Sequence, residues 1–192
     1  SIKDLSGWEL PATTLAERCY YAMFRESGIG GVPHLPATTL AKYCYGCMFY
    51  QCYQLTDLSD VFFPDVTLAP SCYYQMFYEC KNVVSAPEIL PARVLASSCY
   101  YGMFMYCRML EKAPVLPAAV LEAGCYRSMF EMCTSLSYIK MLAQDITASN
   151  CLYKWVANVP SSGTFVLDAN ATWSVTGQSG IPEGWTVVTA EP

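Results

Sequence analysis

The stretch PARVLASSCYYGMFMYC, residues 91–107, sets the pattern for most of this 192-residue chain. Its leading cysteine is followed at once by tyrosine, and Met-Phe occupies the fourth and fifth positions after that cysteine. A second cysteine stands eight residues after the first, and a proline stands eight residues before it. Near-copies of the stretch contain the leading cysteines Cys19, Cys44, Cys72, Cys99, Cys125 and Cys151. Their spacing of 25 to 28 residues indicates a repeat architecture in which each unit packs against its neighbours.

Each repeat divides into two halves with different periods. In the first half, Leu95, Cys99 and Met103 are four residues apart, which predicts the buried side of a helix. Pro91 suits the first turn of that helix, because its missing N–H would have no partner there. The second half is a short apolar segment typical of a strand, at residues 55–58, 83–86, 110–113 and 136–139. We therefore predict an α/β repeat solenoid, with one helix and one short parallel strand in each repeat of about 26 residues.

The motifs LPATTLA, CYxxMFxxC and the CTSL-type segment resemble the BspA-like class of leucine-rich repeat, over roughly residues 9–158. The ending, GTFV…TW…SGIPEGWTVV, is similar to the closing segment of such arrays. These arrays occur in surface proteins of host-associated anaerobic bacteria, and the better-known members are implicated in adhesion. The resemblance implies a right-handed leucine-rich-repeat superhelix and an extracellular or cell-surface location. The third repeat departs from the pattern with FPD at residues 63–65, and the sixth lacks both the tyrosine and Met-Phe.

The organisation along the chain follows from where the repeat stops. We expect a solenoid of about six repeats over residues 1–160, the first and last atypical, and a small C-terminal β cap over residues 161–192. The segments TFVL, NATW and GWTVV of this cap have strand-like composition and are separated by turn signals. The cap would cover the last repeat, and we expect Trp8 to cover the first. Because the chain begins at Ser1 without a signal peptide, we interpret it as a mature or trimmed fragment of an exported protein.

Eleven cysteines in an exported protein raise the question of disulfides. The leading cysteines would lie on adjacent helices about 8–10 Å apart, beyond the limit of about 7 Å for a disulfide. The second set, next to the predicted strands, could approach the strand spacing of about 4.8 Å, so pairing there stays open. Bridges at alternate positions would distort an even ladder. We therefore expect free, buried thiols that act as small apolar packing residues.

Little in the sequence indicates chemistry. Cys44 and Cys47 form a CxxC followed by Cys52, but a lone CxxC without a second pair or nearby histidines is a weak metal signal. His34, the only histidine, lies in a connector and has no equivalent in other repeats. We expect no enzyme activity, cofactor or metal. A net charge of −5 argues against nucleic acid as a partner. The sequence has no run of about 18 apolar residues, so we expect no membrane-spanning segment.

Two surfaces of the predicted solenoid are candidates for binding. The strand side varies between repeats inside a fixed framework, and it is the concave side in arrays of this kind. The residues expected to line it are Asp57, Ser85, Glu111, Lys112 and Tyr138. The alternative is an aromatic row on the convex side, formed by Tyr21, Tyr74 and Tyr101. Packing against the cap is the competing interpretation for Tyr138.

The sequence thus suggests two functions of different classes. The first is a non-enzymatic cell-surface adhesion module that contacts a host or microbial protein or glycan. The second is a structural spacer that holds another domain away from the cell envelope. Saturable binding that is lost when strand-side residues change would distinguish the first from the second.

Overall fold

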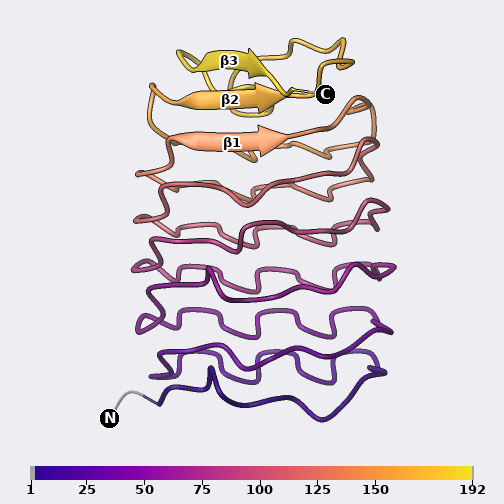
Figure 1. The fold of residues 1–192 in the computed structure, drawn as a ribbon, viewed down its shortest axis with the longest axis vertical. Coiled ribbons are helices and arrows are strands. Elements are labelled where there is room, and N and C mark those ends of the chain that lie inside the picture. Colours follow the sequence, from indigo (N-terminus) through magenta and orange to yellow (C-terminus); the bar gives the residue numbers. More distant parts are fainter. Residues whose placement is uncertain (1–2, 192) are drawn as a thin grey trace.

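The computed structural model describes residues 3–191, which wind into a stack of coils with about one coil per repeat (Figure 1). Three strands are present, β1 (Tyr138–Met141), β2 (Thr164–Leu167) and β3 (Thr186–Thr189), in one parallel sheet of order β1-β2-β3. Residues 3–191 contain no helix. The predicted leucine-rich-repeat solenoid with one helix per repeat is therefore wrong.

Consecutive turns replace the predicted helix in every repeat. In the second coil, Tyr43, Cys47 and Gln51 have φ values of 55°, 52° and 56°, in the left-handed region that an α-helix excludes. A positive φ at every fourth residue turns the backbone into a stepped ribbon, here called the turn ladder (residues 43–52 in the second coil). The same three positions of each coil are left-handed: Arg18, Ala22, Glu26, Tyr43, Cys47, Gln51, Ser71, Gln75, Glu79, Ser98, Gly102, Tyr106, Gly124, Ser128, Met132, Asn150, Lys154 and Asn158.

Hydrogen bonds of two kinds alternate along the turn ladder. The Gly46 N–H donates to the Tyr43 carbonyl within a turn at 3.0 Å, whereas the next N–H, of Cys47, donates to the Tyr74 carbonyl of the third coil at 2.8 Å. This alternation recurs in the first five coils. It satisfies the backbone groups of a segment that has neither helix nor strand. It also gives the turn ladders a polarity, because each one donates its alternate N–H groups to the turn ladder that follows it.

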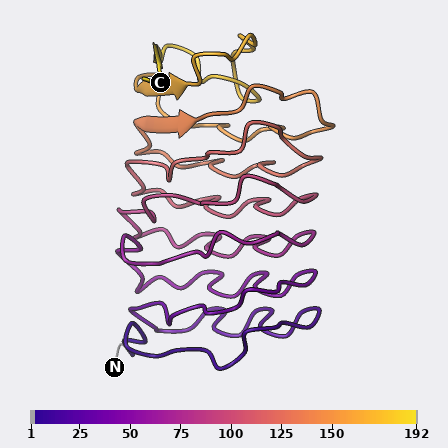
Figure 2. The ribbon, with the colours of Figure 1, turned by 45° about the vertical axis from the view of Figure 1, so that its right-hand side comes forward.

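The core lies directly inside the turn ladders. The tyrosines after the leading cysteines stack from coil to coil, as in Tyr45–Tyr73 with ring centroids 5.7 Å apart and planes 4° from parallel. The phenylalanines of Met-Phe form a second stack, in which Phe77 lies 5.4 Å from Phe49 and 5.7 Å from Phe104. Stacked pairs of this kind contribute about 0.5–1.5 kcal/mol each beyond the area they bury. The recurring CYxxMFxxC motif is therefore the inner lining of one side of the stack, which keeps a similar outline along its length (Figure 2).

The cysteines pack for a different reason from the one we expected. All eleven are thiols, and ten are buried, with Cys19 exposed. The helix-to-helix spacing used to argue against disulfides does not apply, because there are no helices. Instead, the second cysteine of the second to fifth coils donates its S–H to a phenylalanine carbonyl of the preceding coil. That carbonyl already accepts a backbone N–H within its own turn. The Sγ–O distances are 2.9 Å for Cys52–Phe24, 3.0 Å for Cys80–Phe49, 3.2 Å for Cys107–Phe77 and 3.1 Å for Cys133–Phe104.

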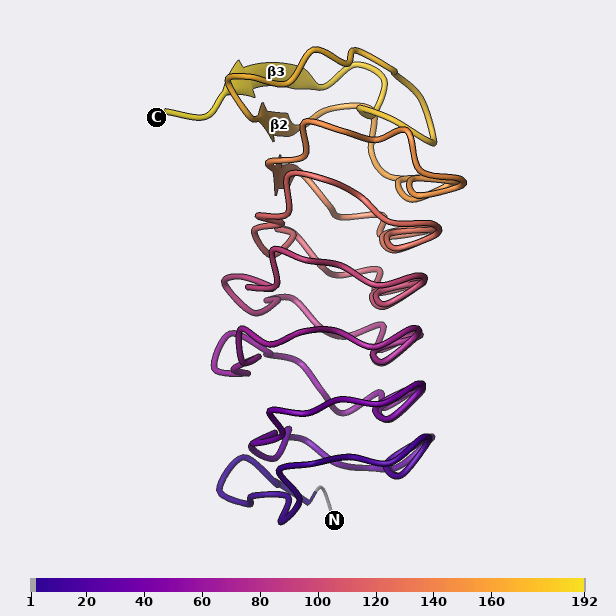
Figure 3. The same ribbon diagram turned by 90° about the vertical axis from the view of Figure 1, so that its right-hand side faces the viewer.

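The other half of each coil is extended and pairs in parallel with its neighbours. Asp57 pairs with Ser85, Ser85 with Lys112, and Lys112 with Tyr138 at the start of β1. Only the last of these extended segments is long enough to form a strand. The prolines lie in such extended segments rather than at helix starts, since Leu90 before Pro91 donates its N–H to Val115 of the next coil at 3.1 Å. Figure 3 shows β2 and β3 on one side of the stack and the hooked turn ladders on the other.

The two ends of the stack are finished differently. Within residues 161–192, β2 and β3 extend the parallel sheet from β1, with Tyr138 paired to Thr164 and Thr164 to Thr186. Trp155 of the last turn ladder donates its indole N–H to Gly180 at 2.8 Å, and Trp185 donates to Pro160 at 2.7 Å. We expected Trp8 to cover the opposite end of the stack, but Trp8 is 67% exposed and does not cover it.

Candidate functional site

The parallel pairing brings four of the five predicted site residues onto one line. Asp57, Ser85, Lys112 and Tyr138 pair in succession, and we call them the strand line. Asp57 and Lys112 are exposed, while Ser85 and Tyr138 are half-buried. Glu111 lies one residue out of this register and is also exposed, and its carbonyl accepts the N–H of Ser137 at 2.9 Å. Neighbouring members of the line are about one strand spacing apart, ~4.8 Å.

The side chains of the strand line interact little with one another. The Lys112 ammonium lies 5.2 Å from the ring centroid of Tyr138, which is a cation–π contact. The Asp57 carboxylate accepts the Ser59 N–H at 2.8 Å, and this hydrogen bond lowers the pKa of Asp57 below its usual value. Asp57 is therefore ionised near neutral pH. The line presents a carboxylate, a hydroxyl, an ammonium and a phenol in sequence along the stack.

Two adjoining depressions lie beside the strand line. The larger has a volume of about 430 Å³, within the range of about 300–1,000 Å³ that ligand sites occupy. Its lining residues are Ser59, Val84, Ser85, Ala86, Pro87, Glu88, Glu111, Lys112 and Ala113. The smaller, of about 310 Å³, shares Ser59 and Glu88 with the first. It adds Phe62, which is 63% exposed, so the surface combines carboxylates with an apolar side chain.

Ser59, Phe62 and Glu88 contribute to this surface and are not among the residues predicted from the sequence. A signal was present, because the spacing from Cys44 to Cys72 is 28 residues, the longest in the array. The additional residues enlarge the connection after Leu58, and Phe62 lies exposed there. A repeat that is longer than the others indicates a loop that departs from the common coil. Such a loop can place side chains on the surface at positions that the regular coil does not provide.

The alternative aromatic row is less open than its composition suggests. Tyr21 is 42% exposed, but Tyr74 and Tyr101 are half-buried and stack on each other with centroids 4.9 Å apart. Tyr43 packs its edge against Tyr74 at 5.6 Å, and the Arg127 guanidinium lies 5.3 Å from the Tyr101 centroid. Neighbouring side chains thus cover the ring faces that a sugar would need for stacking.

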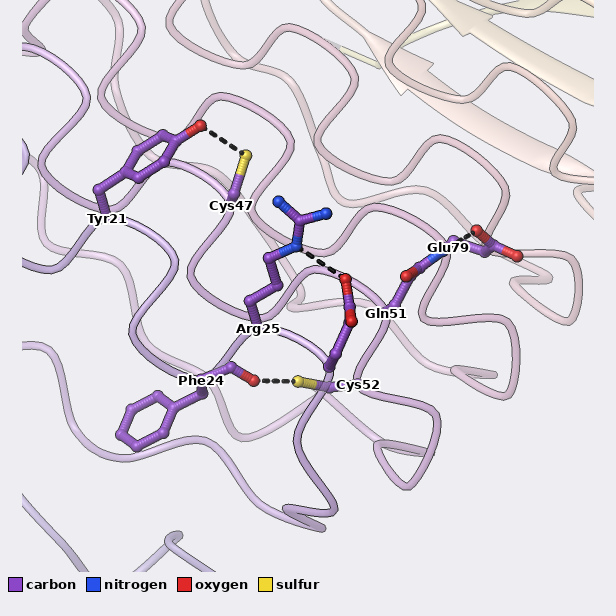
Figure 4. A network of polar contacts seen from close by, with 8 residues as sticks. Tyr21, Phe24, Arg25, Cys47, Gln51, Cys52 and Glu79 are labelled. Atoms are coloured by element: carbon purple, nitrogen blue, oxygen red, sulfur yellow. Dashed lines mark hydrogen bonds and ion pairs between the residues drawn. The ribbon is translucent and has the colours of Figure 1, made fainter.

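Of the three cysteines around the CxxC motif, Cys47 and Cys52 contact separate partners (Figure 4). Cys47 donates its thiol proton to the Tyr21 hydroxyl at 3.6 Å, and Cys52 donates to the Phe24 carbonyl. Burial raises the pKa of the Cys44 thiol to about 11, and burial also raises the pKa of Cys47 and of Cys52. These are packing thiols that resist ionisation, whereas a metal ligand or a nucleophile must be a thiolate. No group of three His, Cys, Asp or Glu side chains with metal-binding geometry occurs within residues 3–191.

His34 lies on the surface, with its Nδ1 3.8 Å from a Glu9 carboxylate oxygen. Glu9 and His34 also pair through their backbones in adjacent coils.

Residues 3–191 contain no helix that is both long and apolar enough to cross a membrane. Comparisons of the chain with protein-family models, with curated proteins and with solved structures found no match.

Proposed function

We propose that this chain is a non-enzymatic binding module that contacts a protein partner through the strand line and its adjoining depressions. The observation that carries this proposal is the succession of parallel pairs that sets four unlike side chains, two exposed and two half-buried, on one line. The turn ladders on the opposite side repeat almost unchanged and are occupied by their own packing. The surface suited to recognition is therefore the one whose side chains differ between coils.

The chemistry of the depressions favours a partner with basic and apolar side chains. Glu88 and Glu111 line the larger depression with a single ammonium, from Lys112, and Asp60 and Phe62 line the smaller. Protein recognition is favoured over glycan stacking, since neighbours cover the tyrosine ring faces of the opposite side. The resemblance of the motifs to bacterial surface proteins supports a location outside the cell and a host or microbial partner.

The test is a binding screen against arrayed extracellular-matrix proteins, bacterial surface proteins and glycans, followed by variants of the strand line. For any protein captured saturably, Glu111→Lys and Tyr138→Ala should weaken binding by about tenfold or more, with little change in melting temperature. Tyr21→Ala, on the turn-ladder side, is the matched control and should bind normally. If Tyr21→Ala abolishes binding while the strand-line variants do not, the assignment is wrong.

A spacer is the second candidate, and one observation favours it. The hydrogen-bond lattice and the aromatic stacks run without interruption through the array, as a stiff rod would require. A pure spacer should show no saturable binding to any member of the same arrays, and charge reversal at Glu111 should then change nothing.

A further inference from the structure

The turn ladder of the first coil presents a row of carbonyls that receive no backbone hydrogen bond from residues 3–191. In the second coil, five alternate carbonyls accept N–H groups from the first coil, namely those of Lys42, Cys44, Gly46, Met48 and Tyr50. The equivalent carbonyls of the first coil are those of Glu17, Cys19, Tyr21, Met23 and Arg25. None of these five accepts a backbone hydrogen bond from residues 3–191. The row is regular, because the first coil has the same left-handed positions as the others.

Side chains beside this row that are core residues in other coils are more exposed here. Met23 is 52% exposed and Cys19 is exposed, whereas their equivalents Met48 and Cys44 are fully buried. Phe24 stacks on Phe49 on one face only, at 5.5 Å. Phe24 also lines an apolar depression of about 560 Å³, whose lining residues are Lys3, Asp4, Leu5, Trp8, Phe24, Ser27 and Ile29.

We propose that this face of the first coil is a docking surface for one further coil of the same repeat class, joined ahead of Lys3. Such a coil would supply the alternate N–H groups that the acceptor row needs. It would also add a tyrosine above Tyr20 and a phenylalanine above Phe24. A covalently joined coil meets the face at high effective concentration, whereas a separate molecule would pay the full cost of association.

The polarity of the turn ladders makes a second copy of this chain a poor occupant. Two first-coil turn ladders would oppose acceptors to acceptors. The last turn ladder of another copy cannot serve either, because its Lys154 N–H donates to the Ser179 hydroxyl at 3.0 Å and its Val156 N–H to the Gln178 carbonyl at 3.2 Å. One end of the array accepts further coils and the other does not.

The experiment fuses a copy of residues 85–111 directly ahead of Lys3 and measures the thiol reactivity of Cys19 with a disulfide reagent. In the unfused chain Cys19 is the exposed cysteine, so it should react rapidly. In the fusion we expect its reaction to slow by at least tenfold and the melting temperature to rise. The control fusion carries serine in place of the copied Tyr100 and Phe104, and should leave Cys19 reactive.

Two results would overturn the proposal. In one, Cys19 reacts in the fusion as fast as in the unfused chain, because the added coil does not dock. In the other, the unfused chain forms a dimer in sedimentation experiments that protects Cys19, which opposed acceptor rows of two turn ladders would not support. Neither result depends on whether the strand line binds a partner.

Discussion

The two sides of each coil repeat in different ways. On the turn-ladder side, both the backbone and the side chains are copied, so that cysteine meets cysteine, tyrosine meets tyrosine and phenylalanine meets phenylalanine in the next coil. On the strand line only the backbone pairing is copied, and the side chains run from Asp57 through Ser85 and Lys112 to Tyr138. The difference follows from where the side chains lie. A side chain inside the stack must fit its own equivalents above and below, whereas one outside it need not.

The largest effect that separates the two sides should be alkaline unfolding. Burial raises the pKa of Cys99 to about 12 and raises the pKa of Cys72, Cys80 and Cys107 far above the ordinary range. Because the folded state holds these protons more tightly than an unfolded thiol of pKa about 8.5, stability is intact below that pH and is lost as pH rises toward the folded pKa. Between the unfolded and the folded pKa, each buried thiol should lower the free energy of unfolding by about 1.4 kcal/mol per pH unit.

The measurement is urea unfolding under reducing conditions between about pH 7 and about pH 9.5, below most tyrosine ionisation. The Cys80→Ala and Cys107→Ala variants test the cause, since each should reduce the slope of unfolding free energy against pH by one proton. A free energy of unfolding that stays constant up to about pH 9.5 would show that the cysteine thiols are not buried in solution.

The next effect compares two phenylalanines of one chain. Phe77 is fully buried between two stacked rings, and Phe77→Ala should cost about 3–5 kcal/mol of unfolding free energy. Phe62 is 63% exposed beside the strand line, and Phe62→Ala should cost less than about 0.5 kcal/mol. Denaturant midpoints measure both. Equal losses would mean that the stacked phenylalanines do not contribute more to stability than an exposed surface residue does.

The repeat and its coil-by-coil stacking could be predicted from the sequence. The pattern of buried positions, however, does not distinguish a helix from a turn ladder. The buried positions of CYxxMFxxC lie within an arc of about 140° on a helix at 100° per residue, so the motif satisfies a helix as well. A clue lay in the glycines. Gly102 and Gly124 fall inside the predicted helices, where glycine costs about 1 kcal/mol, and in the structure they occupy left-handed positions. Most other coils place non-glycine residues there, which hides the signal.

The strand line was more accessible to sequence reasoning because pairing in a repeat needs only matched spacing. The positions of Ser85 and Lys112, five residues after the second cysteines Cys80 and Cys107, are enough to align them. The depressions were not accessible, since they depend on how the long connection after Leu58 folds back against Glu88. That arrangement comes from tertiary packing and occurs once, so no periodicity reports it.

The smallest effect concerns the contact between Lys112 and Tyr138. Lys112→Ala removes a solvent-exposed cation–π pair at 5.2 Å, and the expected loss is about 0.5 kcal/mol of unfolding free energy. Lys112→Arg keeps a cation over the ring and should restore most of that loss. In the Tyr138→Ala background, Lys112→Ala should have no further effect, because the double-mutant cycle then contains no partner for the ammonium. Urea midpoints of the four proteins give the coupling energy directly. A loss above about 2 kcal/mol for Lys112→Ala alone would contradict the contrast between the two sides, since it would make the strand line part of the framework that holds the coils together.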